Sequence, residues 1–171
     1  MANVNLPFGF IPVKHQDGSP EHLTEYRIAS SYGTTLGLGQ AVVLTGTGIG
    51  QRPTIAAAAG SGEDVLGVFA GCEFVASLGI AKPQKSLFWP SGQVLRTGTV
   101  ARAWVWDDPE QEYVIQGDST VWAVTDLGLN ADFVAGTTNT STGRAGSTLN
   151  GTGKAVTATI SCRIKRLFDD P

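Results

Sequence analysis

Apolar and polar residues alternate along several short segments of the chain, and the longest of these runs lies near the C-terminal end. Over residues 156–165 every second side chain is apolar, and the side chains between them carry a hydroxyl group or a positive charge. A β-strand directs successive side chains to opposite faces, so a period of two predicts a strand with one buried face. The face expected to be buried holds Val156, Ala158, Ile160, Cys162 and Ile164.

Two runs in the middle of the chain predict strands close to a core. Residues 65–72 are apolar at both parities, which is typical of a central strand that is buried on both faces. Glycines inside this run predict a bend or a close approach of two backbones, as at a barrel corner. The alternation in residues 99–106 places two tryptophans on one face and small residues on the other. The small residues are Ala101, Ala103 and Val105.

Further short strands are expected between turns that are rich in glycine. They cover residues 26–29, 41–45, 52–58, 86–89, 94–97, 111–116 and 120–124. Residues 45–50 and 60–62 have the glycine content of turns, since glycine adopts positive φ without a steric penalty. Short strands separated by such turns predict an all-β fold, an antiparallel barrel or sandwich, with residues 21–171 as its single domain.

A long loop precedes the last predicted strand. Residues 135–153 consist almost entirely of Gly, Thr, Ser, Asn and Ala, with little apolar surface to bury. Ordering such a loop costs on the order of 1 kcal/mol or more per residue. We therefore expect this loop to take its shape from a neighbouring molecule.

Residues 1–20 have the pattern of an extended N-terminal arm. The segment 6–13 is apolar but is interrupted by Pro7, Gly9 and Pro12. Proline fixes φ, lacks an N–H donor and keeps the preceding residue extended, so this segment is neither a helix nor a central strand. An apolar arm has to be covered, either by its own domain or by a neighbouring subunit. Ser19 and Pro20 could begin a helix, but the residues that follow favour a strand.

Composition and charge exclude several classes of function. Charged residues make up only 16% of the 171 residues, and the formal net charge is -3. Nucleic-acid binding needs a basic face, so no nucleic-acid partner is expected. The sequence contains no run of about 20 apolar residues that could span a membrane and no pattern of a signal peptide. We expect a protein that is made in the cytoplasm, has no membrane partner and buries a surface of low charge against another protein.

Residue types that carry chemistry are few and dispersed. His15 and His22 lie in the irregular N-terminal region, and no nucleophile elbow accompanies them. The carboxylates at 107–112 lack the spacing of a calcium loop and fit a solvated turn. Cys72 and Cys162 lie in apolar runs and are expected to be free, buried thiols. We predict no catalytic constellation, no metal and no cofactor.

Several segments together resemble a known family. These segments are the arm at 7–13 with 17–20, the runs 26–29 and 65–69, Trp106-Asp107-Asp108-Pro109, residues 127–130, Thr142-Gly143-Arg144, and Arg163-Ile164. They are similar to segments of the head decoration, or cement, proteins of tailed bacteriophages. The likeness covers most of the chain and rests on structural segments of low specificity.

The resemblance implies a structural role outside the capsid. Such a protein binds the outer surface of the virion head, contacts the major capsid protein and clamps neighbouring capsid subunits of the expanded head. It forms homo-oligomers, for which a homotrimer is expected in preference to a homodimer. The residues expected to contact the capsid or another subunit are Leu6, Phe8, Phe10, Ile11, Val13, Thr138, Arg144, Arg163 and Arg166.

Two other functions stay open on the sequence. One is a different virion component, namely a minor capsid protein, the base of a head fibre or a tail protein. The other is a carbohydrate-binding β-sandwich that stacks sugars on exposed tryptophans, for which Trp104 and Trp122 are the candidates. In a β-protein of this size tryptophans more often belong to the core.

Overall fold

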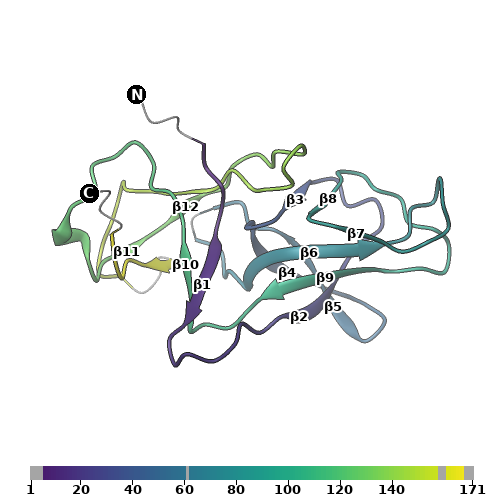
Figure 1. Cartoon of the computed structure of the whole chain (residues 1–171), viewed down its shortest axis with the longest axis horizontal. Coiled ribbons are helices and arrows are strands. Elements are labelled where there is room, and N and C mark those ends of the chain that lie inside the picture. The colour runs from purple at the N-terminus through teal and green to yellow at the C-terminus, as the bar shows by residue number, and fades with distance from the viewer. Residues whose placement is uncertain (1–5, 61, 158–160, 168–171) are drawn as a thin grey trace.

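The computed structural model describes residues 6–60, 62–157 and 161–167 and shows an all-β protein. The strands form two parts that lie side by side along the long axis (Figure 1). One part is a small barrel formed by residues 24–106. The other, which we call the lobe, combines the N-terminal segment with residues 107–167. The predicted all-β fold is confirmed, and of the two architectures that the sequence left open, barrel or sandwich, the largest sheet has the form of a barrel.

Five strands close the barrel. They are β2 (Thr24–Ile28), β4 (Ala41–Ile49), β5 (Arg52–Ala57), β6 (Gly67–Phe74) and β9 (Ala101–Trp106). Their order is β4-β5-β2-β9-β6, and β6 pairs again with β4 through Val68 and Ala41, which closes the ring. Each neighbouring pair is antiparallel apart from β2 and β5, which run parallel.

Three shorter strands complete the barrel half of the molecule. β7 (Gln84–Ser86) extends the sheet at the far end of β6. β3 (Leu36–Gly37) pairs with β8 (Phe88–Trp89) to form a separate two-stranded ribbon. The ribbon contributes Leu36 and Trp89, both fully buried, to the barrel core.

The barrel interior follows the alternation seen in the sequence. Ala101, Ala103 and Val105 of β9 are each 0% exposed, and they face the core. In β6, Phe69 faces the barrel core, whereas Val68 faces the lobe, so this strand is buried on both faces as predicted. The strand bulges between Phe69 and Gly71, where a φ of 127° is accessible to glycine. The bulge turns the strand sharply enough to help close a five-stranded barrel.

The lobe consists of short paired strands. β1 (Ile11–His15) pairs with β10 (Gln111–Val114), β11 (Asn130–Ala131) pairs with β14 (Cys162–Arg163), and β12 (Phe133–Val134) pairs with β13 (Thr148–Leu149). A 3-10 turn covers Val124–Asp126. β1 lies within the segment predicted to be an extended arm. It accommodates Pro12 because it is an edge strand whose register shifts between Pro12 and Lys14.

A second apolar cluster joins the lobe to the outer face of the barrel. Phe10 and Phe133 of the lobe meet Ala41, Ala58 and Val68 of the barrel, and all five are buried. The Phe10 ring packs edge-on against Phe133, with 5.8 Å between the ring centroids. The apolar segment at 6–13 is therefore covered, at Phe10, by its own chain.

Several strand predictions are wrong. Residues 94–97 and 120–124 are not strands, and β4 continues through the turn expected at 45–50 as far as Ile49. The long alternating strand is confirmed only at Cys162 and Arg163. Val156 is 85% exposed and has no strand partner, so the prediction that it faces a core is wrong. Residues 158–160 of that predicted strand lie outside the described residues.

Candidate functional site

An apolar groove of about 160 Å³ lies where the N-terminal segment crosses the junction of the barrel and the lobe. Four separate parts of the chain build it: the N-terminal segment up to β1, the connection between β3 and β4, the end of β9, and the tip of the hairpin that follows β12. The lining residues are Phe8, Phe10, Ile11, Pro12, Leu38, Trp106 and Arg144. The structure therefore brings four of the predicted contact residues together around one depression.

Two glycines let the N-terminal segment approach the barrel closely. The N–H of Phe10 donates to the carbonyl oxygen of Gly39 at 2.9 Å. Gly9 has a φ of 75°, and a Cβ at this position would lie 2.6 Å from the same oxygen. A larger residue at Gly9 would push the segment away from the barrel, because backbone atoms cannot move aside. The groove thus depends on this backbone crossing.

The tip of the hairpin forms the opposite wall of the groove. The N–H of Leu38 donates to the carbonyl oxygen of Gly143 at 2.8 Å, and the N–H of Ala145 donates to the carbonyl oxygen of Leu38 at 2.9 Å. Ala145 and Ser147 are fully buried. The prediction that the loop at 135–153 takes its shape from a neighbouring molecule is wrong, because its own barrel holds it through these bonds.

The predicted contact residues differ in their surroundings. Leu6 is 70% exposed and Val13 is 50% exposed, and Arg144 points its charged side chain to the surface beside the groove. Thr138 is half-buried and packs beside Gly37, away from the groove. The two remaining residues, Arg163 and Arg166, are exposed at the far end of the lobe.

Sequence reasoning missed two residues of the groove wall. Leu38 stands between Gly37 and Gly39, and a leucine flanked by glycines is a signal for a side chain held where two backbones meet. Trp106 was assigned to a strand face but not to a site. Its indole Nε1–H is buried and has no hydrogen-bond acceptor among the residues that the structure describes.

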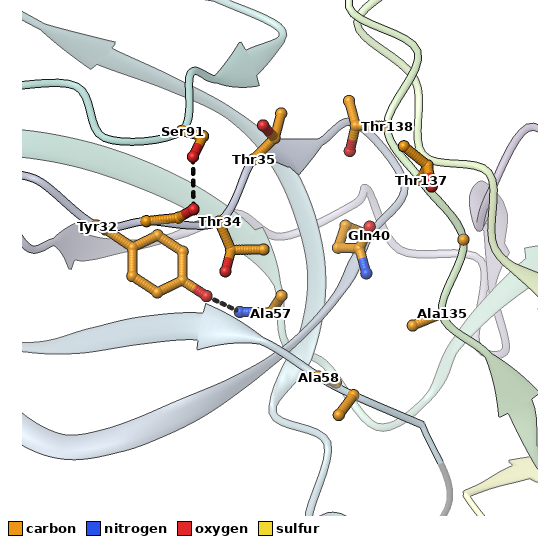
Figure 2. Close-up of a pocket in the computed structure, with 13 residues that line it drawn as sticks. Tyr32, Thr34, Thr35, Gln40, Ala57, Ala58, Ser91, Ala135, Thr137 and Thr138 are labelled. Atoms are coloured by element: carbon orange, nitrogen blue, oxygen red, sulfur yellow. Dashed lines mark hydrogen bonds between the residues drawn. The ribbon is translucent and has the colours of Figure 1, made fainter.

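A larger cavity of about 500 Å³ lies between the barrel and the base of the same hairpin (Figure 2). Its walls carry the hydroxyl groups of Tyr32, Thr34, Thr35, Ser91, Thr137 and Thr138. Gln40, which is 3% exposed, projects its amide into the cavity. The hydroxyl oxygen of Tyr32 accepts the N–H of Ala57 at 2.8 Å, and this bond fixes one wall. The lining is uncharged, so the cavity suits water or a neutral polar group.

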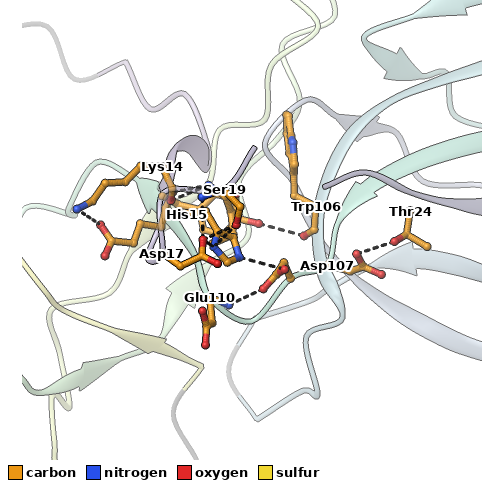
Figure 3. A network of polar contacts seen from close by, with 12 residues as sticks. Lys14, His15, Asp17, Ser19, Thr24, Trp106, Asp107 and Glu110 are labelled. Carbon is orange, nitrogen blue, oxygen red and sulfur yellow. Dashed lines mark hydrogen bonds and ion pairs between the residues drawn. The ribbon is translucent and has the colours of Figure 1, made fainter. Parts of the chain in front are cut away.

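A polar network surrounds His15 at the start of the lobe (Figure 3). His15 is 6% exposed, with Nδ1 2.5 Å from Asp17 Oδ1 and Nε2 3.1 Å from Asp108 Oδ2. The Ser19 hydroxyl also donates to Asp17 Oδ1. The network therefore ties the connection between β1 and β2 to the turn between β9 and β10.

Hydrogen bonding in this network shifts three pKa values. The bond to Asp17 raises the pKa of His15. Bonds from the Ser19 hydroxyl and N–H, followed by the bond to His15, lower the pKa of Asp17 to about 2. The N–H of Glu110, and then His15, lower the pKa of Asp108. The residue types are those of a Ser-His-Asp triad, and the Ser19 hydroxyl oxygen lies 3.2 Å from His15 Nδ1. That hydroxyl, however, donates to the Asp17 carboxylate, and the imidazole is held between Asp17 and Asp108. This is the geometry of a structural clamp.

The cysteines and tryptophans mostly serve packing. Cys72 and Cys162 are free thiols, and burial raises the pKa of each to about 12. Trp89 is fully buried in the barrel core. Lys154 Nζ lies 4.6 Å from the centroid of the Trp122 ring and covers that face against a stacking sugar. Trp104, the other sugar-stacking candidate, is half-buried on the outer face of β9.

The acidic turn at 107–112 is structured by hydrogen bonds. Asp107 accepts the hydroxyl groups of Thr24 at 2.8 Å and Tyr26 at 2.7 Å, which joins the end of β9 to β2. Within residues 6–60, 62–157 and 161–167, the structure contains no group of three or more His, Cys, Asp or Glu side chains that could hold a metal ion.

Comparisons with known proteins found no matching family model, no matching curated protein and no matching solved structure. In the described part of the chain, no helix has the length and apolar character needed to cross a bilayer.

Proposed function

We propose that this chain is a non-enzymatic structural protein of a tailed-bacteriophage virion. It binds the outside of the capsid, contacts the major capsid protein and clamps neighbouring capsid subunits of the expanded head. The observation that carries the proposal is the apolar groove, which gathers Phe8, Ile11 and Arg144 from segments far apart in the sequence. These residues belong to the segments that resemble head decoration proteins.

The groove and its margin have the properties of a protein-binding surface. Leu6 and Val13 expose apolar surface on the same N-terminal segment. An exposed apolar rim beside a depression is typical of an interaction site rather than of isolated surface residues. Arg144 adds a guanidinium group at the edge, a group that is enriched in protein interfaces.

The edge of β1 offers a second mode of contact. In the described residues β1 pairs with one strand, β10, so its other edge has main-chain groups available to a neighbouring strand. Strand addition supplies affinity through main-chain hydrogen bonds and specificity through alternate side chains. In our proposal the segment at 6–13 provides both the edge and the apolar contacts.

We further propose that the protein acts as a homo-oligomer, a homotrimer in preference to a homodimer. A clamp on a symmetric shell gains from repeated weak contacts, because each bound site raises the effective concentration at the next. In a symmetric oligomer the small groove of each subunit is repeated, so the total contact with the capsid is larger than one subunit could make.

The test uses expanded heads that lack the protein. The full chain should sediment with these heads and raise their resistance to heat and to low ionic strength. Leu6→Asp changes an exposed side chain of the N-terminal segment, and Arg144→Glu changes an exposed side chain of the groove lining. Each should weaken binding at least about tenfold. Leu78→Asp is the matched control, since Leu78 is 86% exposed and lies outside the groove. Failure of the unaltered protein to bind or stabilise heads would overturn the proposal.

Labelling of purified particles distinguishes this role from that of another virion component. A decoration protein is distributed over the whole head surface. Label confined to a vertex, a fibre or the tail would contradict our assignment and favour the alternative role.

A further inference from the structure

Three arginines converge on one carboxylate on the outer face of the barrel. Arg27 of β2 donates through Nη1 to Glu25 Oε1. Arg52 at the start of β5 and Arg102 of β9 each place Nε 3.8 Å from that same oxygen. Arg52 Nη1 also donates to the main-chain oxygen of Glu25 at 3.0 Å. Guanidinium groups from three neighbouring strands therefore share a single negative charge.

The strand register places these groups in a row. Arg27 lies opposite Arg102 in the pair β2–β9, Glu73 lies opposite Arg102 in the pair β6–β9, and Lys85 lies opposite Glu73 in the pair β6–β7. Directly opposite residues of antiparallel strands project from the same face. Ala101 and Ala103, on either side of Arg102, face the core, so this row lies on the outer face.

The row has an excess of positive charge. The row itself holds three basic side chains (Arg27, Arg102 and Lys85) and one carboxylate (Glu73), and the adjoining pair of Arg52 and Glu25 leaves the net charge of +2 unchanged. Like charges directly opposite each other destabilise a sheet, and here two guanidinium groups face one another across β2 and β9. A bound anion would relieve that repulsion. The excess stands out in a chain whose net charge is -3.

Hydrogen-bond donors remain available in the same place. The side chains of Arg52 and Arg102 are 46% and 53% exposed. Arg102 makes no side-chain hydrogen bond within the described ranges, because its distance to Glu25 is too long for one. Each guanidinium carries five N–H donors in a planar fork that fits carboxylate and phosphate oxygens in pairs. Arg27 is held by Glu25 and supplies charge, while Arg52 and Arg102 supply open forks.

We propose that Arg27, Arg52 and Arg102 form a binding site for an oxyanion, a phosphate or a carboxylate group. Arg52 and Arg102 donate charge-assisted hydrogen bonds to its oxygens, and such bonds are stronger than hydrogen bonds between neutral groups. The site lies on the barrel and shares no residue with the apolar groove. It is therefore independent of the capsid-binding proposal.

The experiment follows the arginine side-chain Nε–H signals of the ¹⁵N-labelled full chain by NMR. Inorganic phosphate and citrate are titrated separately, with sodium chloride adjusted to keep the ionic strength constant. We expect saturable shifts at Arg52 and Arg102 and none at Arg96, an exposed arginine in the connection between β8 and β9. Saturation by phosphate alone assigns a tetrahedral ligand, saturation by citrate alone assigns a carboxylate, and saturation by both assigns a general oxyanion site.

Variants test which side chains hold the anion. Arg102→Gln and Arg52→Gln should each weaken binding about tenfold, because each removes a charged fork. Arg96→Gln should leave the affinity unchanged. Circular dichroism and melting curves establish that each variant is folded. The proposal is overturned if the unaltered chain shows no saturable shift at constant ionic strength, or if folded Arg102→Gln and Arg52→Gln both bind as tightly as the unaltered chain.

Discussion

The barrel strands are five to nine residues long and close on one another, whereas β11 to β14 of the lobe are two residues each and pair only in twos. Apolar side chains from β2, β4, β5, β6 and β9 fill the barrel interior. The lobe buries Phe10 and Phe133 against the outer wall of the barrel. A small domain is stabilised mainly by burial of apolar surface, so the lobe depends on the barrel more than the barrel depends on the lobe.

Charge divides the molecule along the same boundary. Residues 24–106 contain six Lys or Arg and four Asp or Glu, so their formal net charge is +2. The other residues contain six Lys or Arg and eleven Asp or Glu, so their formal net charge is −5. The two proposed sites also differ. The barrel carries the arginine site on a rigid sheet, and the groove lies where the lobe crosses the barrel. A partner bound in the groove would thus stabilise the weaker half of the molecule.

The largest predicted effect comes from Phe69→Ala in the barrel core. Phe69 is fully buried, and removal of its ring leaves a cavity that should lower the free energy of unfolding by about 3–5 kcal/mol. Both halves should unfold together, as measured by urea titration with far-ultraviolet circular dichroism and tryptophan fluorescence. Val121→Ala is the control, since Val121 is 84% exposed and should change stability by less than about 0.5 kcal/mol. Lobe structure that outlasts the barrel would contradict the dependence argued above.

The next effect should separate the two halves. Phe133→Ala removes a ring that packs on Phe10 at the junction, and should lower the stability of the lobe by about 3 kcal/mol. Amide hydrogen exchange should accelerate throughout the lobe while barrel amides retain their protection. Val134→Ala, at the neighbouring half-exposed position, should leave the exchange pattern unchanged. Equal loss of protection in barrel and lobe would mean that the halves form one cooperative unit.

The barrel was more predictable from sequence than the lobe, and the reason is physical. The alternation of Ala101, Ala103 and Val105 and the two-sided apolar run at 65–72 both reappear in the structure. Each of these strands has partners on both edges, so the period of two is enforced by burial. The same alternation at Val156 meets no partner strand, and the side chain remains exposed.

The candidate site was predictable in its parts but not in its assembly. The sequence predicted Phe8, Ile11 and Arg144 as contact residues. The hydrogen bond between the N–H of Leu38 and the carbonyl oxygen of Gly143, however, joins segments about a hundred residues apart in the sequence. Polar loops give no periodic signal, so the contact that orders residues 135–153 could not be predicted. The arginine site depends on register across β2, β5 and β9, which sequence alone does not fix.

Changes in pH should alter the stability of the clamp at His15 more than the stability of the barrel. The pKa of His15 is raised above 6.5 by its bond to Asp17, so its contribution to stability is present below pH 6.5 and fades as the pH rises through the folded-state pKa. The pKa of Asp17 is lowered from 3.8 to about 2, so its contribution is present above pH 3.8 and fades as the pH falls toward 2. The clamp should therefore be strongest between these limits.

The pH dependence can be isolated by substitution. His15→Gln should remove the loss of stability that occurs as the pH rises above 6.5, whereas His22→Gln, at an exposed position of the same connection, should retain it. Unfolding free energies across pH and the NMR titration of His15 provide the measurements. A His15 imidazole that titrates below pH 6.5 would show that the clamp does not hold the proton.

The smallest effect concerns the hairpin tip. The side chain of Asn139 accepts the N–H of Ser141 at 3.0 Å, and its main chain bonds to Arg144 and Gly143. Asn139→Ala removes the side-chain acceptor and should lower local stability by about 1 kcal/mol, which corresponds to about fivefold faster exchange at the Ala145 N–H. Thr140→Ala is the matched control in the same turn. The Ala145 N–H should be protected in the isolated, unaltered protein, because its acceptor is the carbonyl oxygen of Leu38 in the same chain. An unprotected Ala145 that becomes protected only on capsid binding would show instead that the partner orders the tip.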